Sequence, residues 1–220
     1  MRVVIAGGHG KIALRLARLL SDRGDEPVGL IRDLGQAPDL AEVGCDAVLC
    51  DLEQVGVDEL AGHVVGADAV VFAAGAGPGS GADRKDTVDR AAAELLADAA
   101  RKAGVRQYLL ISSMGLDQAG ADGVDPVFAA YLVAKKAAED AIRVFGLDWT
   151  ILRPGRLTDD PGTGRVRLGA PPIHHGAVSR DDVAAVLAEL LTRPGSARHT
   201  LELVGGADPV ADAVYLAVGG

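Results

Sequence analysis

The first fifteen residues, Met1–Arg15, read MRVVIAGGHGKIALR and decide the fold of this chain. The apolar run 3–6 predicts a buried strand that leads directly into the glycine turn 7–10. A helical pattern follows, with apolar residues at Ile12, Leu14, Leu16, Leu19 and Leu20. The order of strand, glycine turn and helix aims the free N–H groups of a helix N-terminus at one point, which is a site for a phosphate group.

The glycines are spaced as Gly7-x-x-Gly10-x-x-Ala13, which differs from the more familiar G-x-G-x-x-G pattern. Gly7 suits the tight turn, Gly10 lets the backbone approach a phosphate, and Ala13 lets the helix pack closely on the strand. The pattern therefore predicts a dinucleotide corner, and the alternative is a plain turn in an unrelated α/β protein. The residues expected to hold the pyrophosphate are Gly7, Gly8, His9, Gly10, Lys11 and Ile12.

Length, composition and charge limit the class of protein. The chain has 220 residues, 49% of them apolar, which suits one α/β domain with a full core. A net charge of −9 argues against a nucleic-acid partner. No apolar stretch reaches the length of a membrane span, and the N-terminus lacks the profile of a signal peptide. We therefore expect a cytoplasmic protein that binds neither membrane nor nucleic acid.

Cysteine and histidine usage gives no sign of a metal site. Cys45 and Cys50 are the only cysteines, and on one strand they would face opposite sides. They are typical of small buried hydrophobic residues rather than of a disulfide or metal pair. The adjacent His174 and His175 have no third ligand nearby, so we expect no metal and interpret them as surface or pocket-lining residues.

Strand and helix patterns alternate along the chain, which predicts a doubly wound parallel sheet, the Rossmann fold. Residues 1–220 form a single NAD(P)-binding domain in this interpretation, with small substrate-region insertions at about 153–178 and 195–220. The small insertions suit a small ligand. The predicted strands are 2–6, 27–31, 46–50, 68–73, 106–112, 148–152 and a later one near 199–204. The predicted helices are 11–23, 84–103, 127–145, 180–192 and a short one near 209–217.

The tip of the second predicted strand indicates which dinucleotide binds. An acid at this position holds the ribose 2′-hydroxyl of NAD. Here the position is Arg32, whose guanidinium suits a 2′-phosphate, so NADP(H) is favoured over NAD(H). The adjacent Asp33 leaves NAD as an alternative. Arg15, one turn into the first helix, is a second candidate for the phosphate or else a solvated surface charge.

The remaining candidate cofactor residues follow other predicted strands, because ligands of such sheets lie beyond the carboxyl ends of the strands. They are Asp51, Leu52, Ala73, Ala74, Gly75, Ser112, Pro154 and Gly155. The Asp51 carboxylate has two equal interpretations, as an acceptor for the adenine amino group or as a turn cap. The glycine-rich segments 75–81 and 153–172 lie on the same functional edge of the sheet.

A serine, a tyrosine and a lysine form a candidate reactive set. Ser113 follows the fifth predicted strand, and Tyr131 and Lys135 share one face of a helical pattern at i and i+4. This set resembles the active site of the short-chain dehydrogenase/reductase superfamily. The resemblance implies that Tyr131 exchanges a proton with a carbonyl or hydroxyl oxygen, that Ser113 hydrogen-bonds that oxygen, and that Lys135 promotes the proton transfer and holds the nicotinamide ribose. A buried structural tyrosine with a solvated lysine is the alternative.

The resemblance narrows to the atypical short-chain group of small NAD(P)H-binding, epimerase/dehydratase-like or NmrA-like proteins. It rests on the glycine spacing, on ILRPG at Ile151–Gly155 and on SRDDV at Ser179–Val183, where Ser179 is expected to cap a helix. It also implies that Arg153 and the Pro154-Gly155 turn frame the nicotinamide side. In one departure from the superfamily, Asp89 stands where the fourth catalytic residue is an Asn, and a charged acid there changes the proton relay.

Three functions follow, in order of preference. The first is an NADP(H)-dependent oxidoreductase or epimerase that acts on a small carbonyl or hydroxyl compound through Ser113, Tyr131, Lys135 and Asp89. The second is an NADP(H)-sensing regulator without turnover. The third is a structural subunit that uses only the fold. The expected partner is a small-molecule substrate, and the expected assembly is a monomer or a homodimer.

Overall fold

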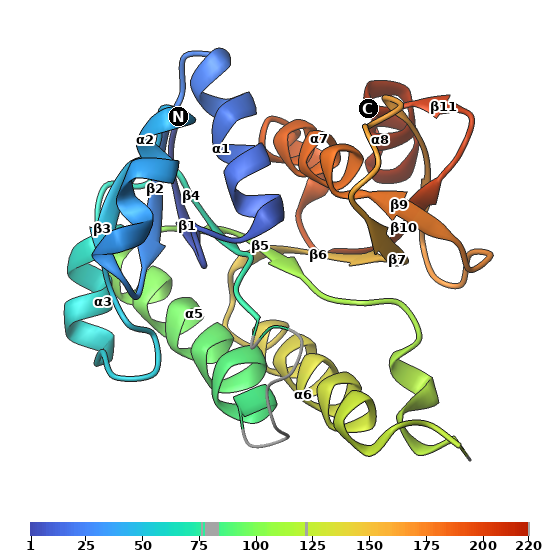
Figure 1. Ribbon diagram of the computed structural model, residues 1–220, viewed down its shortest axis with the longest axis horizontal. Helices are drawn as coiled ribbons and strands as arrows, with labels where there is room; N and C mark the ends of the chain where they lie inside the picture. Colours follow the sequence, from blue (N-terminus) through green and yellow to red (C-terminus); the bar gives the residue numbers. More distant parts are fainter. Residues whose placement is uncertain (76, 78–83, 122, 220) are drawn as a thin grey trace.

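The computed structural model describes residues 1–75, 77, 84–121 and 123–219 (Figure 1). Most of the predicted glycine-rich segment 75–81 therefore lies outside the described residues. The strands are β1 (Arg2–Ala6), β2 (Glu26–Ile31), β3 (Asp46–Leu49), β4 (Ala69–Phe72), β5 (Gln107–Ile111), β6 (Asp148–Pro154), β7 (Arg156–Thr158), β8 (Arg165–Gly169), β9 (Ala177–Ser179), β10 (His199–Gly205) and β11 (Asp208–Pro209). The helices are α1 (Lys11–Asp22), α2 (Ala37–Glu42), α3 (Val57–Val64), α5 (Ala92–Ala103), α6 (Pro126–Ile142), α7 (Arg180–Leu191) and α8 (Val210–Val218).

Nine of the described strands form one sheet, in the order β11-β8-β10-β6-β5-β4-β1-β2-β3. From β3 to β10 every pair is parallel, and β8 runs antiparallel to both of its neighbours, β10 and β11. The order 3-2-1-4-5-6 is that of a dinucleotide-binding Rossmann sheet, so the predicted fold class is confirmed. The chain reverses its direction of winding between β1 and β4, and ligands of such sheets lie beyond that point.

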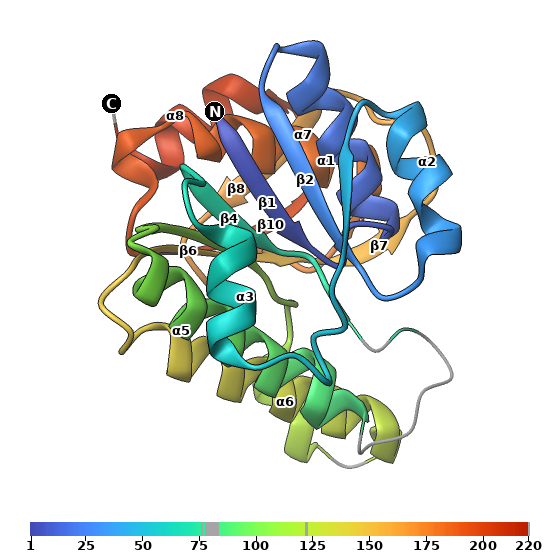
Figure 2. The ribbon, with the colours of Figure 1, turned by 90° about the vertical axis from the view of Figure 1, so that its left-hand side faces the viewer.

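Helices cover both faces of the sheet (Figures 1 and 2). One core cluster joins α1, α7 and α8 to one face, and a second joins α3, α5 and α6 to the other. Successive residues of β1 alternate between the clusters, with Val3 and Ile5 on the first and Val4 on the second. A strand that is buried on both faces explains the continuous apolar runs in the sequence.

Both cysteines are buried and free, as expected. They flank β3, and each belongs to a different core cluster, so Cys45 and Cys50 lie on opposite faces of the sheet. Burial raises the pKa of each thiol to about 11. Neither thiol is therefore ionised near neutral pH, and both pack as small apolar side chains.

Several elements differ from the sequence prediction. The helices α2 and α3 and the short strands β7, β8, β9 and β11 were not predicted. The predicted helix 84–103 begins as a π-helical segment, η2 (Lys85–Ala91), before α5 continues it. A π-helix widens the turn and often occurs at functional sites. Among the described residues, no helix is long and apolar enough to span a membrane.

Candidate active site

In the glycine turn after β1, Gly7 and Gly8 are packed so tightly that a side chain would not fit at either position. Gly7 has a φ of +78°, and a Cβ there would lie 2.6 Å from the Cα of Ala74, the second residue of the segment after β4. A Cβ on Gly8 would lie 2.6 Å from the Cα of Gly29 in β2. The Gly10 N–H donates to the Gly7 carbonyl at 2.8 Å, which closes the turn directly before α1 begins. The turn thus holds the N-terminus of α1 at the switch point of the sheet.

A cavity of about 280 Å³ opens beyond this turn. Nine of the residues predicted to bind the cofactor line it, namely Gly7, His9, Gly10, Arg32, Asp51, Leu52, Ala73, Ala74 and Gly75. The predicted residues Gly8, Lys11, Ile12, Ser112, Lys135, Pro154 and Gly155 do not line it. A narrow backbone cradle, a helix N-terminus without acidic residues in its first turn and an adjoining cavity fit the phosphates and adenosine of a dinucleotide.

The two candidate selectors at the end of β2 have different roles. The Asp33 carboxylate accepts a hydrogen bond from the Gly35 N–H at 2.8 Å and caps the helical turn η1 (Leu34–Gln36). Arg32 is exposed and lines the cavity together with Gln36. The acid is therefore engaged by its own backbone, whereas the cation faces the cavity. Asp51 lines the cavity, and its carboxylate also caps a turn by accepting from the Glu53 N–H at 3.0 Å.

An ion pair that sequence reasoning missed closes one side of the cavity. Arg84 donates to the Glu53 carboxylate at 2.5 Å, and the Thr87 hydroxyl donates to the same carboxylate at 2.9 Å. The hydrogen bond from Arg84 lowers the pKa of Glu53. Both Arg84 and Glu53 line the cavity. No signal in the sequence marks them, because they are 31 residues apart and meet only in the folded sheet.

The charged side chains near the turn point to other elements. His9 contacts Asp39 of α2 at 2.6 Å, and Lys11 donates to Asp159 at 2.7 Å. Arg15 donates to Asp181 of α7. These contacts fix α1 between α2 and α7. We therefore expect the turn to bind a phosphate through its backbone N–H groups rather than through these side chains.

Lys135 and Asp89 form a buried ion pair at the other half of the site. The Lys135 ammonium lies 3.1 Å from the Asp89 carboxylate and donates to the Ile111 carbonyl at 3.0 Å. The Asp89 side chain is fully buried and that of Lys135 is 5% exposed. The ammonium also lies 5.8 Å from the centre of the Tyr131 ring. The π-helical segment η2 supplies Asp89 and α6 supplies Lys135, and these two elements pack side by side.

The serines after β5 point in different directions. The Ser112 hydroxyl is buried and donates to the Glu139 carboxylate at 2.6 Å. The Ser113 side chain is half-buried, and its hydroxyl donates to the Met114 carbonyl at 3.1 Å. Tyr131 is also half-buried. Ser113 and Tyr131 are therefore both partly accessible, whereas the hydroxyl of Ser112 is buried.

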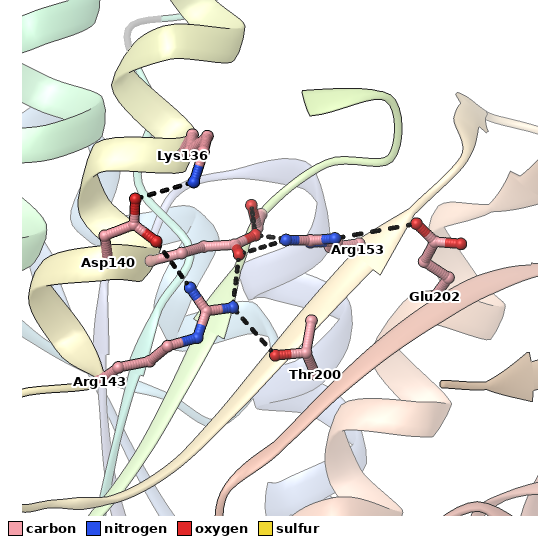
Figure 3. A network of polar contacts seen from close by, with 8 residues as sticks. Lys136, Asp140, Arg143, Arg153, Thr200 and Glu202 are labelled. Atoms are coloured by element: carbon pink, nitrogen blue, oxygen red, sulfur yellow. Dashed lines mark hydrogen bonds and ion pairs between the residues drawn. The ribbon is translucent and has the colours of Figure 1, made fainter. Parts of the chain in front are cut away.

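Arg153 was expected to frame the nicotinamide side, but its side chain turns into the protein. Its guanidinium binds the buried Glu139 carboxylate through two nitrogens, at 2.8 and 2.6 Å (Figure 3). The hydrogen bond that Arg153 donates to the Glu139 carboxylate raises the pKa of Arg153. The following Pro154 carbonyl accepts from the Met114 N–H at 3.1 Å, which holds the ends of β5 and β6 together. His174 and His175 are exposed.

Known proteins resemble this chain over nearly its whole length. Over 215 residues it is 33% identical to a Bacillus subtilis protein named "Uncharacterized sugar epimerase YhfK", which covers 97% of this chain and 99% of that protein. The structure of the oxidoreductase YlbE of Lactococcus lactis superposes with a TM-score of 0.85 at 26% identity, over 98% of this chain and 96% of that one. The structure of the anaerobillin reductase ChuY of Escherichia coli O157:H7 superposes with a TM-score of 0.77 at 26% identity, over 93% of this chain and 97% of that one.

These likenesses agree with the glycine turn and the adjoining cavity. Relatives that are named for oxidoreductase and epimerase activities place the chain in an oxidoreductase- and epimerase-like class. A family model described as NAD(P)H-binding matches residues 7–194, which include both halves of the candidate site. The chain therefore belongs to the NAD(P)H-binding family.

Proposed function

We propose that this protein is an NADP(H)-dependent oxidoreductase or epimerase that acts on a small carbonyl or hydroxyl compound through Ser113, Tyr131 and Lys135. One observation carries the proposal. Gly75 lines the cofactor cavity, and a Cβ on it would lie 3.2 Å from the Asp89 carboxylate. That carboxylate is paired with Lys135. The buried ion pair of the reactive half therefore adjoins the cavity that fits the dinucleotide.

Each reactive side chain has a distinct task in this proposal. The Tyr131 phenol donates a proton to a carbonyl oxygen, and the Ser113 hydroxyl hydrogen-bonds the same oxygen. Lys135 holds positive charge next to the Tyr131 ring and binds the cofactor ribose. When bound, NADP(H) supplies or accepts the hydride. The same residues would serve an epimerase, in which oxidation and reduction follow each other on one substrate.

Asp89 determines the direction that we favour. Its negative charge lies 3.1 Å from the Lys135 ammonium and offsets the positive charge that would otherwise act on Tyr131. A neutral phenol is the proton donor in carbonyl reduction, whereas oxidation of an alcohol needs the phenolate. We therefore propose reduction as the favoured direction.

The activity test is a screen of small aldehydes and ketones with NADPH, followed at 340 nm. Tyr131→Phe is expected to abolish turnover and to leave NADPH affinity within about twofold, since it removes only the proton donor. Tyr215→Phe is the matched control, because Tyr215 is half-exposed on α8, away from the site. Unchanged turnover in Tyr131→Phe would refute the mechanism.

Arg32 is proposed to select the phosphorylated cofactor, because it lines the cavity while Asp33 is engaged as a cap. Calorimetric titration with NADPH, NADP⁺, NADH and NAD⁺ tests this selection. Arg32→Ser is expected to weaken NADPH binding about tenfold or more and to leave NADH binding unchanged. Arg167→Ser, at an exposed arginine on β8, is the control. Equal affinities for NADPH and NADH in the unaltered protein would overturn the choice of cofactor.

The buried Asp89–Lys135 pair also supports a second candidate, an NADP(H)-sensing regulator. A carboxylate that neutralises Lys135 suits binding without turnover. Such a regulator must bind NADP⁺ and NADPH with unequal affinity, because a ligand that does not distinguish two states cannot shift their populations. The same titration, combined with the activity screen, distinguishes the two candidates. Unequal affinities for NADP⁺ and NADPH without turnover of any carbonyl compound would favour the regulator.

A further inference from the structure

A fully buried carboxylate, Glu139, lies one helical turn beyond Lys135 on α6. Its first oxygen accepts from the Ser112 hydroxyl at 2.6 Å and from the Arg153 Nε at 2.8 Å. Its second oxygen accepts from the Arg153 Nη2 at 2.6 Å and from an Arg143 nitrogen at 2.9 Å. With four donors on two oxygens, the carboxylate is fully hydrogen-bonded, as a buried charge must be.

The network continues past Arg153 to Glu202 (Figure 3). The free end of the guanidinium, Nη1, lies 4.0 Å from the Glu202 carboxylate on β10. The other oxygen of Glu202 accepts from the Ile173 N–H at 2.8 Å. Glu202 is itself 7% exposed. A line of alternating charges thus runs from α6 through the ends of β6 and β10 to the segment 170–176.

Each end of this line is next to a residue of the candidate site. Glu139 shares α6 with Tyr131 and Lys135, and its partner Ser112 directly precedes Ser113. At the far end, Ile173 precedes His174, on the segment that meets β7 where the Arg156 N–H donates to the Gly176 carbonyl at 3.0 Å. The network therefore connects the helix that carries the proton donor to a loop beside the substrate region.

We propose that Glu139 is a positioning residue. It fixes the position of α6 relative to Ser113 and, through Arg153 and Glu202, couples both to the segment 170–176. This inference rests on the proposed function for its catalytic consequence. Its structural consequence, the coupling of α6 to the loop, is independent of any reaction. Glu139 does not touch the reacting atoms in this proposal. It acts by keeping Tyr131, Lys135 and Ser113 in one geometry, and a misplacement of about 1 Å costs roughly 100-fold in rate.

The first test is Glu139→Gln, which keeps the volume and removes the charge. Turnover of 4-nitrobenzaldehyde with NADPH is expected to fall about 10- to 100-fold in kcat. The dissociation constant for NADPH should stay within about twofold, because the glycine turn lies at the other half of the site. Amide exchange at Ile173 should become faster. Glu42→Gln, the same substitution at an exposed glutamate of α2 outside the network, is the matched control and should alter none of these values.

A double variant separates positioning from simple stability. Removing one member of a buried pair leaves an uncompensated charge, whereas Glu139→Gln with Arg153→Gln removes both members of that pair. Arg143 keeps Asp140 as its partner at 3.0 Å, and Glu202 keeps the hydrogen bond from the Ile173 N–H. The double variant is expected to recover thermal stability relative to E139Q while its kcat stays low and Ile173 exchange stays fast. Recovery of kcat together with stability would show that Glu139 only holds the fold, and would overturn the proposal.

The outcomes also separate this inference from the proposed function. If the unaltered protein turns over no carbonyl compound, the proposed function fails, and amide exchange at Ile173 still decides the coupling. If turnover is measured but E139Q changes neither kcat nor the exchange of the segment 170–176, the coupling is wrong and the proposed function stands.

Discussion

The substitution Gly7→Ala tests the packing of the glycine turn against a matched control at Gly24. Both glycines have a left-handed φ, +78° at Gly7 and +84° at Gly24. An alanine in that conformation costs roughly 1–2 kcal/mol. The two sites differ in their surroundings: a Cβ on Gly24 has nothing within 4 Å, whereas a Cβ on Gly7 would lie 2.6 Å from the Ala74 Cα and 2.8 Å from its backbone nitrogen.

The difference between the two variants gives the cost of the close approach. The atoms that meet the new methyl group at Gly7 are backbone, so the end of β4 must move to accommodate it. Forcing a methyl group into a packed region costs typically about 1–3 kcal/mol. We therefore expect Gly24→Ala to lower the free energy of unfolding by about 1–2 kcal/mol, and Gly7→Ala by about 2–5 kcal/mol.

Urea denaturation measures the two free energies, and calorimetry measures NADPH binding. Because Gly7 and Ala74 both line the cavity, Gly7→Ala should weaken NADPH binding about tenfold or more, while Gly24→Ala should leave it unchanged. If both variants lose the same stability and bind NADPH alike, the turn is not held against the segment after β4. The assignment of the phosphate corner would then be wrong.

Three further predictions concern the frame of the site. Ser179→Ala removes the buried cap of α7 and should cost about 1–2 kcal/mol of unfolding free energy in urea. Cys45 and Cys50, with thiol pKa values raised to about 11 by burial, should resist iodoacetamide at pH 8 until the protein is unfolded, as mass spectrometry would show. The hydrogen bond from Arg15 lowers the pKa of Asp181, so its stabilising effect is present above about pH 4 and is lost at lower pH. Asp181→Asn should therefore be less stable than the unaltered protein at pH 7, and the gap should close as the pH falls below about 4.

The sequence predicts the cofactor half of this molecule well, because that half depends on local geometry. A strand, a glycine turn and a helix are adjacent in the chain, and a parallel sheet brings the ends of β1, β2, β3 and β4 to one edge. Nine of the predicted cofactor residues accordingly line a single cavity. Lys11, which was also expected at the pyrophosphate, is ion-paired with Asp159 in the structure.

The C-terminal part was harder to predict because its strands are short and pair over long distances. The strand β8 pairs antiparallel with β10, more than thirty residues later in the chain. Its alternation over five residues is too brief to mark a strand. The helix α3 was missed for a similar reason, because its eight residues span only about two turns.

The burial of Glu139 could not be predicted from the sequence, and the reason is physical. A glutamate in a helical pattern normally faces solvent, so the sequence alone would predict Glu139 to be a surface residue. It is buried because its partners Ser112 and Arg153 come from 27 and 14 residues away. The reactive half of the site is therefore specified by long-range pairing of ions, whereas the cofactor half is specified by backbone conformation. Substitutions that preserve backbone geometry should be tolerated around the cavity, but at Glu139, Arg153 and Lys135 the charge itself is required.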